Sequence, residues 1–559
     1  MRLILLAALF LFIHEEGTAQ KTKAENLSDS ERIYWDTRKQ HIRSKGCYYK
    51  DDLIGITKEK HGKWRFYDGK GTLTEVQNFY RNRIHGKQQT YHPNKTVSNE
   101  SYFIFNVADS IYREWNNEGQ LTVQGSYEMG SPDGEWRYYF KDGRLKSKTR
   151  ISNDTVYLIS QFLMDSAYTQ IIKNGAGAIK SFYISGGLKE KSTYENGLKT
   201  GPYEKRLVNG IISVLGRYQK GLKVDRWNFY FPNGRIEKSI NYQLDTLHGS
   251  YLIMNIDSTI NTSGNYKYGK KEGAWLWYNT NDKIEMKGSF QDGEQHGEWQ
   301  YYFSSGELSY TANYKKGLRN GTWTYYFKDG TLFKQGNYLS DLKEGVWETN
   351  YENGTRLIEG SYTEGLEEGL WINYWDNGSI KNEGHFKKGS LNGIWNSYSP
   401  KSRLLLTGKY HKGLKTGTWE TFNSAGKLLL IESFKVIKSD KQSTEIIVIG
   451  RSEEVAVLHG LFKAYSETDF AIKASGSYKN GKKNGTFIDY YPGGIVPTIV
   501  AQYKDGKLHG IFQQFSRGGS IRHQINYKND LKDGAFLIFN SSGKVAVRKQ
   551  FSKGREIRN

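Results

Sequence analysis

The chain has 559 residues and a formal net charge of +21, and 14% of its residues are aromatic although only 37% are hydrophobic. The aromatic content excludes a largely disordered chain. It favours a thin β structure in which large rings supply much of the buried surface. A single cysteine, Cys47, excludes an intramolecular disulfide and a cysteine-based metal cluster.

Residues 1–19 have the pattern of a signal peptide. A basic residue precedes an apolar run, residues 3–13, which is too short to span a bilayer, and small residues lead up to Ala19. We therefore predict cleavage after Ala19 and export to the periplasm, the cell surface or the medium of a bacterium. Residues 20–54 are expected to form a polar N-terminal lead with capping strands.

A glycine followed two residues later by a tryptophan recurs every 24 residues in the middle of the chain. Such a fixed period is typical of a repeat protein. The glycines, expected to lie at turns, are Gly273, Gly297, Gly321, Gly345, Gly369, Gly393 and Gly417. The tryptophans are Trp275, Trp299, Trp323, Trp347, Trp371, Trp395 and Trp419.

The same phase divides most of the chain into repeats. It predicts four repeats in residues 55–153, eleven in residues 173–436, and four in residues 458–559, where a polar C-terminal tail follows. Residues 154–172 are interpreted as a degenerate hairpin, because they are apolar and β-prone and contain no glycine or proline. Residues 437–457 are interpreted as an irregular strand insert.

The unit that begins at Gly321 indicates what one repeat is. Residues 322–327 are rich in aromatic and β-branched residues, as strands are. Asp329-Gly330 predicts a hairpin turn, and residues 331–338 form the returning strand. No stretch of the unit has a helical period. The predicted fold is all-β: an elongated antiparallel meander of about twenty 24-residue β-hairpin repeats in a single twisted sheet.

One spacing of aromatic residues and glycines is shared by the repeats. In one unit its residues are Tyr410, Gly413, Gly417, Trp419, Phe422, Gly426 and Leu428. With this pattern the chain resembles the MORN-repeat-variant family over roughly residues 55–555. The resemblance implies a meander of β-hairpins and a non-enzymatic interaction role, and the family is similar to bacterial proteins described as antitoxin-like. The tryptophan stands where typical MORN units keep a further glycine.

Candidate catalytic or metal-binding residues are few. The sequence contains no nucleophile elbow, zinc-protease motif or Walker loop, so we expect no enzymatic activity and no cofactor. Asn, Asp or Glu replaces histidine before the motif glycine in other repeats. We interpret this position as a left-handed turn residue rather than a metal ligand. The histidines concerned are His61, His85, His248, His296, His459 and His509.

The expected function is an exported scaffold that binds protein or cell-envelope glycan along an extended β surface. The tryptophans are expected to be the core of the sheet, and a ladder that stacks on sugar rings is the alternative. A membrane-surface binder that uses the basic turns is a second possibility, with weak contact to anionic membranes. An antitoxin-like neutraliser of a partner protein is a third. Nucleic acid is not expected, because an exported protein seldom meets it.

Overall fold

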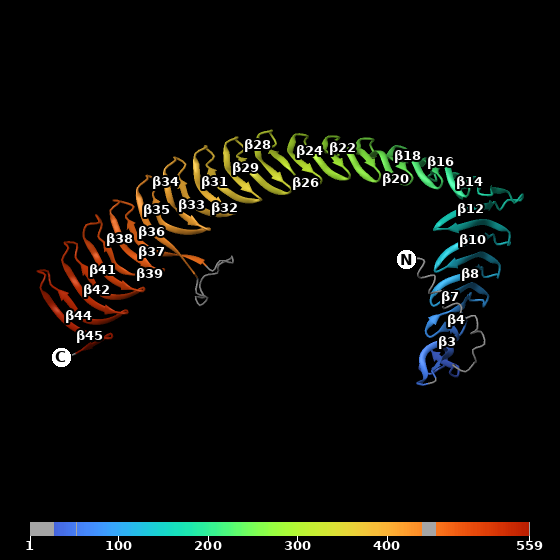
Figure 1. Cartoon of the computed structure of the whole chain (residues 1–559), viewed down its shortest axis with the longest axis horizontal. Helices are drawn as coiled ribbons and strands as arrows, with labels where there is room; N and C mark the ends of the chain where they lie inside the picture. The colour runs from blue at the N-terminus through green and yellow to red at the C-terminus, as the bar shows by residue number, and fades with distance from the viewer. Residues whose placement is uncertain (1–26, 52, 439–453, 558–559) are drawn as a thin grey trace. The chain divides into compact units, whose positions relative to one another are not determined.

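The computed structural model describes residues 27–51, 53–438 and 454–557. Throughout these ranges every regular element is a β-strand, and the strands form one open antiparallel meander of 46 strands (Figure 1). The predicted all-β fold of hairpin repeats is therefore confirmed. The same ranges contain no helix that is long and apolar enough to cross a membrane. The predicted signal peptide and most of the predicted insert in residues 437–457 lie outside the described residues.

The chain divides into two compact units, Met1–Thr259 with Tyr266–Gly269, and Ile260–Asn265 with Lys270–Asn559. Up to Met254 the strands are β1 (Glu31–Tyr34), β2 (Ile42–Asp51), β3 (Gly55–Tyr67), β4 (Leu73–Tyr80), β5 (Arg83–Ile84), β6 (Gly86–Tyr91), β7 (Val97–Ile104), β8 (Val107–Trp115), β9 (Leu121–Glu128), β10 (Ser131–Tyr139), β11 (Leu145–Ser152), β12 (Thr155–Phe162), β13 (Gln170–Lys173), β14 (Ala176–Phe182), β15 (Leu188–Glu195), β16 (Leu198–Arg206), β17 (Ile212–Gln219), β18 (Leu222–Tyr230), β19 (Ile236–Gln243) and β20 (Thr246–Met254).

From Ile260 onward the strands are β21 (Ile260–Lys267), β22 (Lys270–Tyr278), β23 (Ile284–Gln291), β24 (Glu294–Tyr302), β25 (Leu308–Lys315), β26 (Leu318–Arg319), β27 (Gly321–Tyr326), β28 (Leu332–Leu339), β29 (Leu342–Asn350), β30 (Arg356–Thr363), β31 (Leu366–Tyr374), β32 (Ile380–Lys387), β33 (Ser390–Tyr398), β34 (Leu404–His411), β35 (Leu414–Phe422), β36 (Leu428–Lys438), β37 (Glu454–Tyr465), β38 (Ile472–Lys479), β39 (Lys482–Lys483), β40 (Gly485–Tyr490), β41 (Pro497–Lys504), β42 (Lys507–Phe515), β43 (Ile521–Lys528), β44 (Leu531–Phe539), β45 (Val545–Ser552) and β46 (Arg555–Ile557).

Two kinds of turn alternate along the sheet. A five-residue turn closes most hairpins, as between β27 and β28, where the N–H of Phe327 donates to the carbonyl of Thr331 at 2.8 Å. A two-residue turn leads into the next repeat, as at Lys316-Gly317, where both residues have positive φ (52° and 75°). Paired positive φ values match the right-handed twist of the flanking strands. The two-residue turns therefore set the register between neighbouring repeats.

The Gly-x-Trp motif is a β-bulge. Gln335 pairs with Glu348 and Asn337 pairs with Glu344, so Gly345, Val346 and Trp347 lie opposite the single residue Gly336. Gly345 has a φ of 67°, which glycine adopts without the penalty that a side chain brings. The two extra residues keep the alternation of side chains, so the strand does not change face across the bulge.

Alternation gives the sheet two distinct faces. We call one the Trp face, because Trp347 lies on it together with Lys343. The other, the opposite face, carries Leu342, Val346 and Glu348. Within the described residues no second sheet or helix covers either face. The central hydrophobic cluster lies within the Trp face itself and consists of Trp299, Ala312, Trp323, Tyr338 and Trp347.

Candidate functional site

Each tryptophan of the motif packs on a small residue of the preceding strand. A Cβ atom placed on Gly336 would lie 2.0 Å from Cδ2 of Trp347, so only glycine lets the ring come this close. The indole Nε1 of Trp347 donates to the carbonyl of Asn337 at 3.1 Å, which satisfies its polar atom. The same close packing on glycine pairs Gly264 with Trp275, Gly288 with Trp299, Gly360 with Trp371 and Gly408 with Trp419.

The tryptophans form a ladder with tyrosine and phenylalanine rings of the returning strands. Tyr338 meets Trp347 edge to face with ring centroids 5.1 Å apart, and Trp347 meets Tyr362 at 6.3 Å. Among the seven predicted tryptophans, five are between 1% and 8% exposed, whereas Trp371 and Trp395 are half-buried. The five buried rings are those of Trp275, Trp299, Trp323, Trp347 and Trp419. Burial of this degree places the rings in the core and leaves little ring surface for a ligand.

Trp395 departs from this arrangement. Gly384 pairs directly with Trp395, whereas Gly336 lies opposite the whole bulge of its neighbour. Gly393 of the same repeat has a φ of 133°, against 67° at Gly345. The other six motif glycines have φ values between 66° and 100°. The motif thus brings six of the seven tryptophans into one arrangement and leaves Trp395 outside it.

The glycines beneath the rings are the residues that sequence reasoning missed. They stand eleven positions before the tryptophan and two before the aromatic residue of the returning strand, as in Gly336-x-Tyr338 and Gly360-x-Tyr362. This second Gly-x-aromatic pattern has the same 24-residue period as the first. The 24-residue recurrence of these glycines is visible in the sequence. Their role depends on the register between neighbouring repeats, which places each glycine beneath a ring.

The opposite face over β29–β33 carries charged and hydroxyl groups in a shallow groove of about 430 Å³. Arg356 binds Glu348 at 2.8 Å and also contacts Glu359. The Tyr374 hydroxyl donates to Glu359 at 2.5 Å. Burial is the main cause, and this hydrogen bond the second, that raises the pKa of Tyr374 to about 12. One repeat further on, the Tyr398 hydroxyl donates to Glu383 at 2.8 Å.

This part of the chain is acidic although the whole chain is basic. Residues 341–386 contain ten Asp and Glu against three Lys and Arg, a net charge of −7. The total for the chain is +21. The opposite face of these repeats therefore lies in a negative field.

A row of apolar side chains crosses the same face. Val346, Leu370 and Ile394 stand at the second position of three successive Gly-x-Trp motifs. They are 61%, 43% and 52% exposed. The opposite face has no covering layer among the described residues, so these side chains add nothing to the core. On the intervening strands Ser361 and His385 pair with Val346 and Leu370, so apolar and polar side chains alternate along the row, a mixture found in non-obligate protein interfaces.

The repeats match the profile of a known protein family. The profile described as MORN repeat variant matches residues 132–153, 271–292, 295–316, 319–339, 343–364, 367–388 and 508–529. The chain carries MORN-variant repeats. Each match spans one bulged strand, one five-residue turn and one returning strand. No curated protein matches the chain.

Solved structures resemble the MORN-variant repeat chain only weakly. The crystal structure of TcdB2-TccC3-Cdc42 matches with a TM-score of 0.13 and 10% identity, over 91% of this chain and 31% of that chain. The structure of the Photorhabdus luminescens Tc holotoxin pore with the TccC3-D651A mutation gives a TM-score of 0.13 and 10% identity, over 91% and 30%. The chain thus spans about a third of the length of the chains that it matches. Similarity at this level says nothing of function.

Lysines cover many of the rings in the MORN-variant repeats. Lys343 Nζ lies 4.9 Å from the centroid of the Trp347 ring, and Lys271 Nζ lies 4.4 Å from that of Trp275. Burial lowers the pKa of Lys271. An ammonium group over a ring face is attracted by the ring quadrupole. Part of the positive charge is therefore directed onto the Trp face rather than out from the turns.

In several repeats the residue before the motif glycine accepts a hydrogen bond from the following two-residue turn. The N–H of Arg81 donates to His61 Nδ1 at 3.4 Å, and the N–H of Glu364 donates to Glu344 at 3.0 Å. None of the six predicted histidines has a positive φ, so their interpretation as left-handed residues is wrong. What His, Asn, Asp and Glu share here is an acceptor atom. The described residues contain no group of three or more possible metal ligands.

The His61 acceptor predicts a pH-dependent stability in the first repeats. Burial, and then the Arg81 guanidinium, lower the pKa of His61 below its usual 6.5. Neutral His61 is thus favoured in the folded state. Its contribution is complete above pH 6.5 and is lost as the pH falls through 6.5 and then through the lower folded pKa. We expect the stability to fall between pH 7.5 and pH 5, by no more than about 1 kcal/mol, the net value of one hydrogen bond.

The measurement is thermal unfolding of the full chain at pH 7.5 and pH 5, compared with His61→Asn. Asparagine already serves at this position, because Asn392 accepts from the N–H of Lys412 at 3.4 Å. The variant should keep the acceptor and lose the part of the pH dependence that His61 causes. An unchanged pH dependence in the variant would show that His61 does not titrate in this range.

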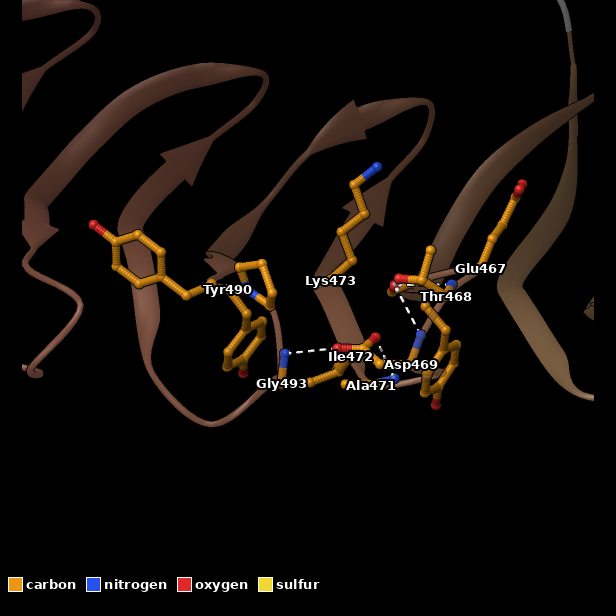
Figure 2. Close-up of a pocket in the computed structure, with 12 residues that line it drawn as sticks. Glu467, Thr468, Asp469, Ala471, Ile472, Lys473, Tyr490 and Gly493 are labelled. Carbon is orange, nitrogen blue, oxygen red and sulfur yellow. Dashed lines mark hydrogen bonds between the residues drawn. The ribbon is translucent and has the colours of Figure 1, made fainter.

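A second depression lies between two enlarged turns near the C-terminus (Figure 2). It has a volume of about 480 Å³ and lies between residues 465–473 and 490–493. Asp469 accepts from the N–H of Gly493 at 2.8 Å and from the N–H of Ala471 at 3.2 Å. The Ser466 hydroxyl and these N–H groups lower the pKa of Asp469. Since the carboxylate is engaged in holding the two turns together, the depression is part of the turn structure.

Proposed function

We propose that this MORN-variant repeat protein is a non-enzymatic scaffold, exported from a bacterial cell, that binds a partner protein along the opposite face of β29–β33. The observation that carries the proposal is the row of Val346, Leu370 and Ile394. These side chains are exposed, apolar and in register over three successive repeats. Groups that can fix a partner's orientation lie beside the row, among them Glu348, Arg356 and Tyr374.

The chemistry of this face favours a protein over a glycan or a membrane. Sugar rings stack on aromatic faces, and the row consists of aliphatic side chains, whereas five of the motif tryptophans are buried. Anionic lipid would be repelled by the net charge of −7 over residues 341–386. A protein that presents apolar side chains together with basic groups fits both features.

Replacing the row with threonine tests the proposal. Thr322 and Thr418 occupy the same position in neighbouring repeats, so Val346→Thr, Leu370→Thr and Ile394→Thr together should change the free energy of unfolding by less than about 0.5 kcal/mol each. Tagged full-length chain is incubated with envelope extract and with cytoplasmic extract at physiological salt. We expect a protein from the envelope extract that the native chain retains and the triple variant loses at least tenfold.

The matched control is the same change at the same repeat position elsewhere. Ile111, Leu461 and Ile511 are also exposed, and their replacement by threonine should leave retention unchanged. Equal loss in both triple variants would mean that retention follows general hydrophobicity. Retention of envelope polysaccharide in place of protein, or of a protein found only in the cytoplasmic extract, would contradict the proposal.

A further inference from the structure

The two-residue turns carry bulky apolar residues in part of the chain. At their first position Phe105 has a φ of 48° and Met129 a φ of 47°. In most other repeats the same position holds a polar residue, such as Lys316, Glu364 or Lys412, with φ values of 52°, 51° and 49°, and Leu244 and Tyr268 are the other bulky residues there. A bulky residue in the left-handed region is an outlier. Neither local conformation nor burial accounts for phenylalanine and methionine at these two turns.

Packed side chains hold this part of the surface in place. The Phe105 ring stacks on His85 with centroids 4.7 Å apart and meets Tyr80 at 5.9 Å. Val107 extends to the next turn, since a Cβ atom on Gly130 would lie 3.3 Å from its Cγ1 atom. We call this surface the turn edge. It consists of Tyr80, Arg81, Ile104, Phe105, Val107 and Met129.

The turn edge is exposed and has the composition of an interface core. Tyr80 is 47%, Phe105 38% and Met129 61% exposed. Aromatic residues, methionine and arginine are the types enriched at the centres of protein interfaces. The Arg81 guanidinium lies 4.1 Å from the centroid of the Tyr49 ring, so part of the edge already presents a cation fixed on an aromatic face.

Arginine at this edge can exchange its carboxylate partners. Arg81 lies 3.8 Å from Asp51 and 3.8 Å from Glu59, and its side chain is 44% exposed. Ion pairs this long and this exposed contribute little stability. Arg83 lies beside Phe105, with Cζ 6.0 Å from the ring centroid. The edge thus presents Arg81, whose ion pairs are long, and Arg83 beside the exposed Phe105 ring.

We propose that the turn edge is a docking site for a partner protein segment in which apolar side chains stand beside carboxylates. The apolar side chains cover Phe105 and Met129, and the carboxylates replace Asp51 and Glu59 as partners of Arg81 and also pair with Arg83. The edge lies in other repeats than the face over β29–β33, and the proposal goes beyond the function proposed above.

A protein segment fits the turn edge better than a lipid surface does. The carboxylates of Asp51, Glu59 and Asp109 lie along it, since Asp109 accepts from the N–H of Met129 at 3.3 Å. Anionic headgroups would be repelled by these three groups. A folded or peptide partner can place its own carboxylates only where the guanidinium groups lie.

The test uses a displayed library of random peptides, selected on the full chain and counter-selected on Phe105→Lys/Met129→Lys. Lysine already occupies this turn position in other repeats, so the variant should fold, and its unfolding temperature should not fall. We expect the selected peptides to combine Asp or Glu with Leu, Ile or Phe. Their affinity for the variant should be at least about tenfold lower, as for the loss of interface anchors.

The matched control is Leu244→Lys/Tyr268→Lys, which makes the same change at two other exposed turn positions with φ values of 52° and 48°. The selected peptides should bind it like the native chain. Peptides that bind Phe105→Lys/Met129→Lys undiminished, or that lose binding equally in the control, would overturn the proposal. It would also be overturned if the native chain bound vesicles of one part phosphatidylglycerol to three parts phosphatidylcholine at physiological salt and the variant did not. Loss of the row on β29–β33 should leave peptide binding intact, which separates this result from the scaffold proposal.

Discussion

Valine in place of Gly336 should expel Trp347 from the core of its repeat and destabilise that repeat by about 3–5 kcal/mol, the range for losing a large buried ring. The reason is geometric. A Cβ atom at Gly336 already lies 2.0 Å from the indole ring, and the two methyl groups of valine leave no rotamer that avoids it. The ring would also lose its hydrogen bond to Asn337 and its edge-to-face contacts with Tyr338 and Tyr362.

Amide hydrogen exchange over β28 and β29 is the suitable measurement, because repeats contact mainly their neighbours and can open locally. Gly336→Ala is the graded control. Ala312 stands at the equivalent position before Trp323, which is 8% exposed against 4% for Trp347, so a repeat with alanine at this position still buries its ring. We expect alanine to cost clearly less than valine. Protection that is equal in the native chain and in both variants would show that the close packing of Gly336 and Trp347 is not a source of stability.

The fold could be predicted from the sequence because each repeat carries its own strand and turn signals. Gly345-x-Trp347 recurs at a fixed spacing and many of the five-residue turns carry Asn-Gly or Asp-Gly, so both the strands and their antiparallel order follow. The role of Gly336 could not be predicted in the same way. It depends on which residue of the preceding strand lies opposite the bulge, and register is set by turns whose conformation the sequence only suggests.

The histidine position shows the same limit. His61, Asn392 and Glu344 share an acceptor atom, but the donor is a turn N–H about twenty residues further along the chain. The left-handed interpretation of this position was based on its residue types alone, and residue types do not show which N–H group each side chain accepts from. The sequence also left open which face of the sheet forms the core. Both carry aromatic residues in the sequence, and only the packing of Trp347 on Gly336 decides which face is the core and which leaves Val346 exposed.

Alanine in place of Trp347 should destabilise its repeat by about 3–5 kcal/mol. The change removes a side chain that is 4% exposed and opens a cavity between Tyr338 and Tyr362. It also leaves Lys343 without the ring that its ammonium group covers. Hydrogen exchange over β29 and protease resistance of the chain measure the effect. A variant with native protection would mean that the Trp face is not the core.

Phenylalanine at the same position supplies the control and a sharper test. Phe487 packs on Gly476, as the tryptophans pack on their glycines, and it is 9% exposed. Trp347→Phe should therefore cost less than alanine, about 1–2 kcal/mol for the lost hydrogen bond and contact area. A Cβ atom on Gly476 would still lie 2.4 Å from Cδ1 of Phe487, so the smaller ring leaves no room for a methyl group beneath it. Adding Gly336→Ala to Trp347→Phe should therefore destabilise the repeat further. A double variant as stable as Trp347→Phe alone would show that close packing on Gly336 does not hold the ring in place.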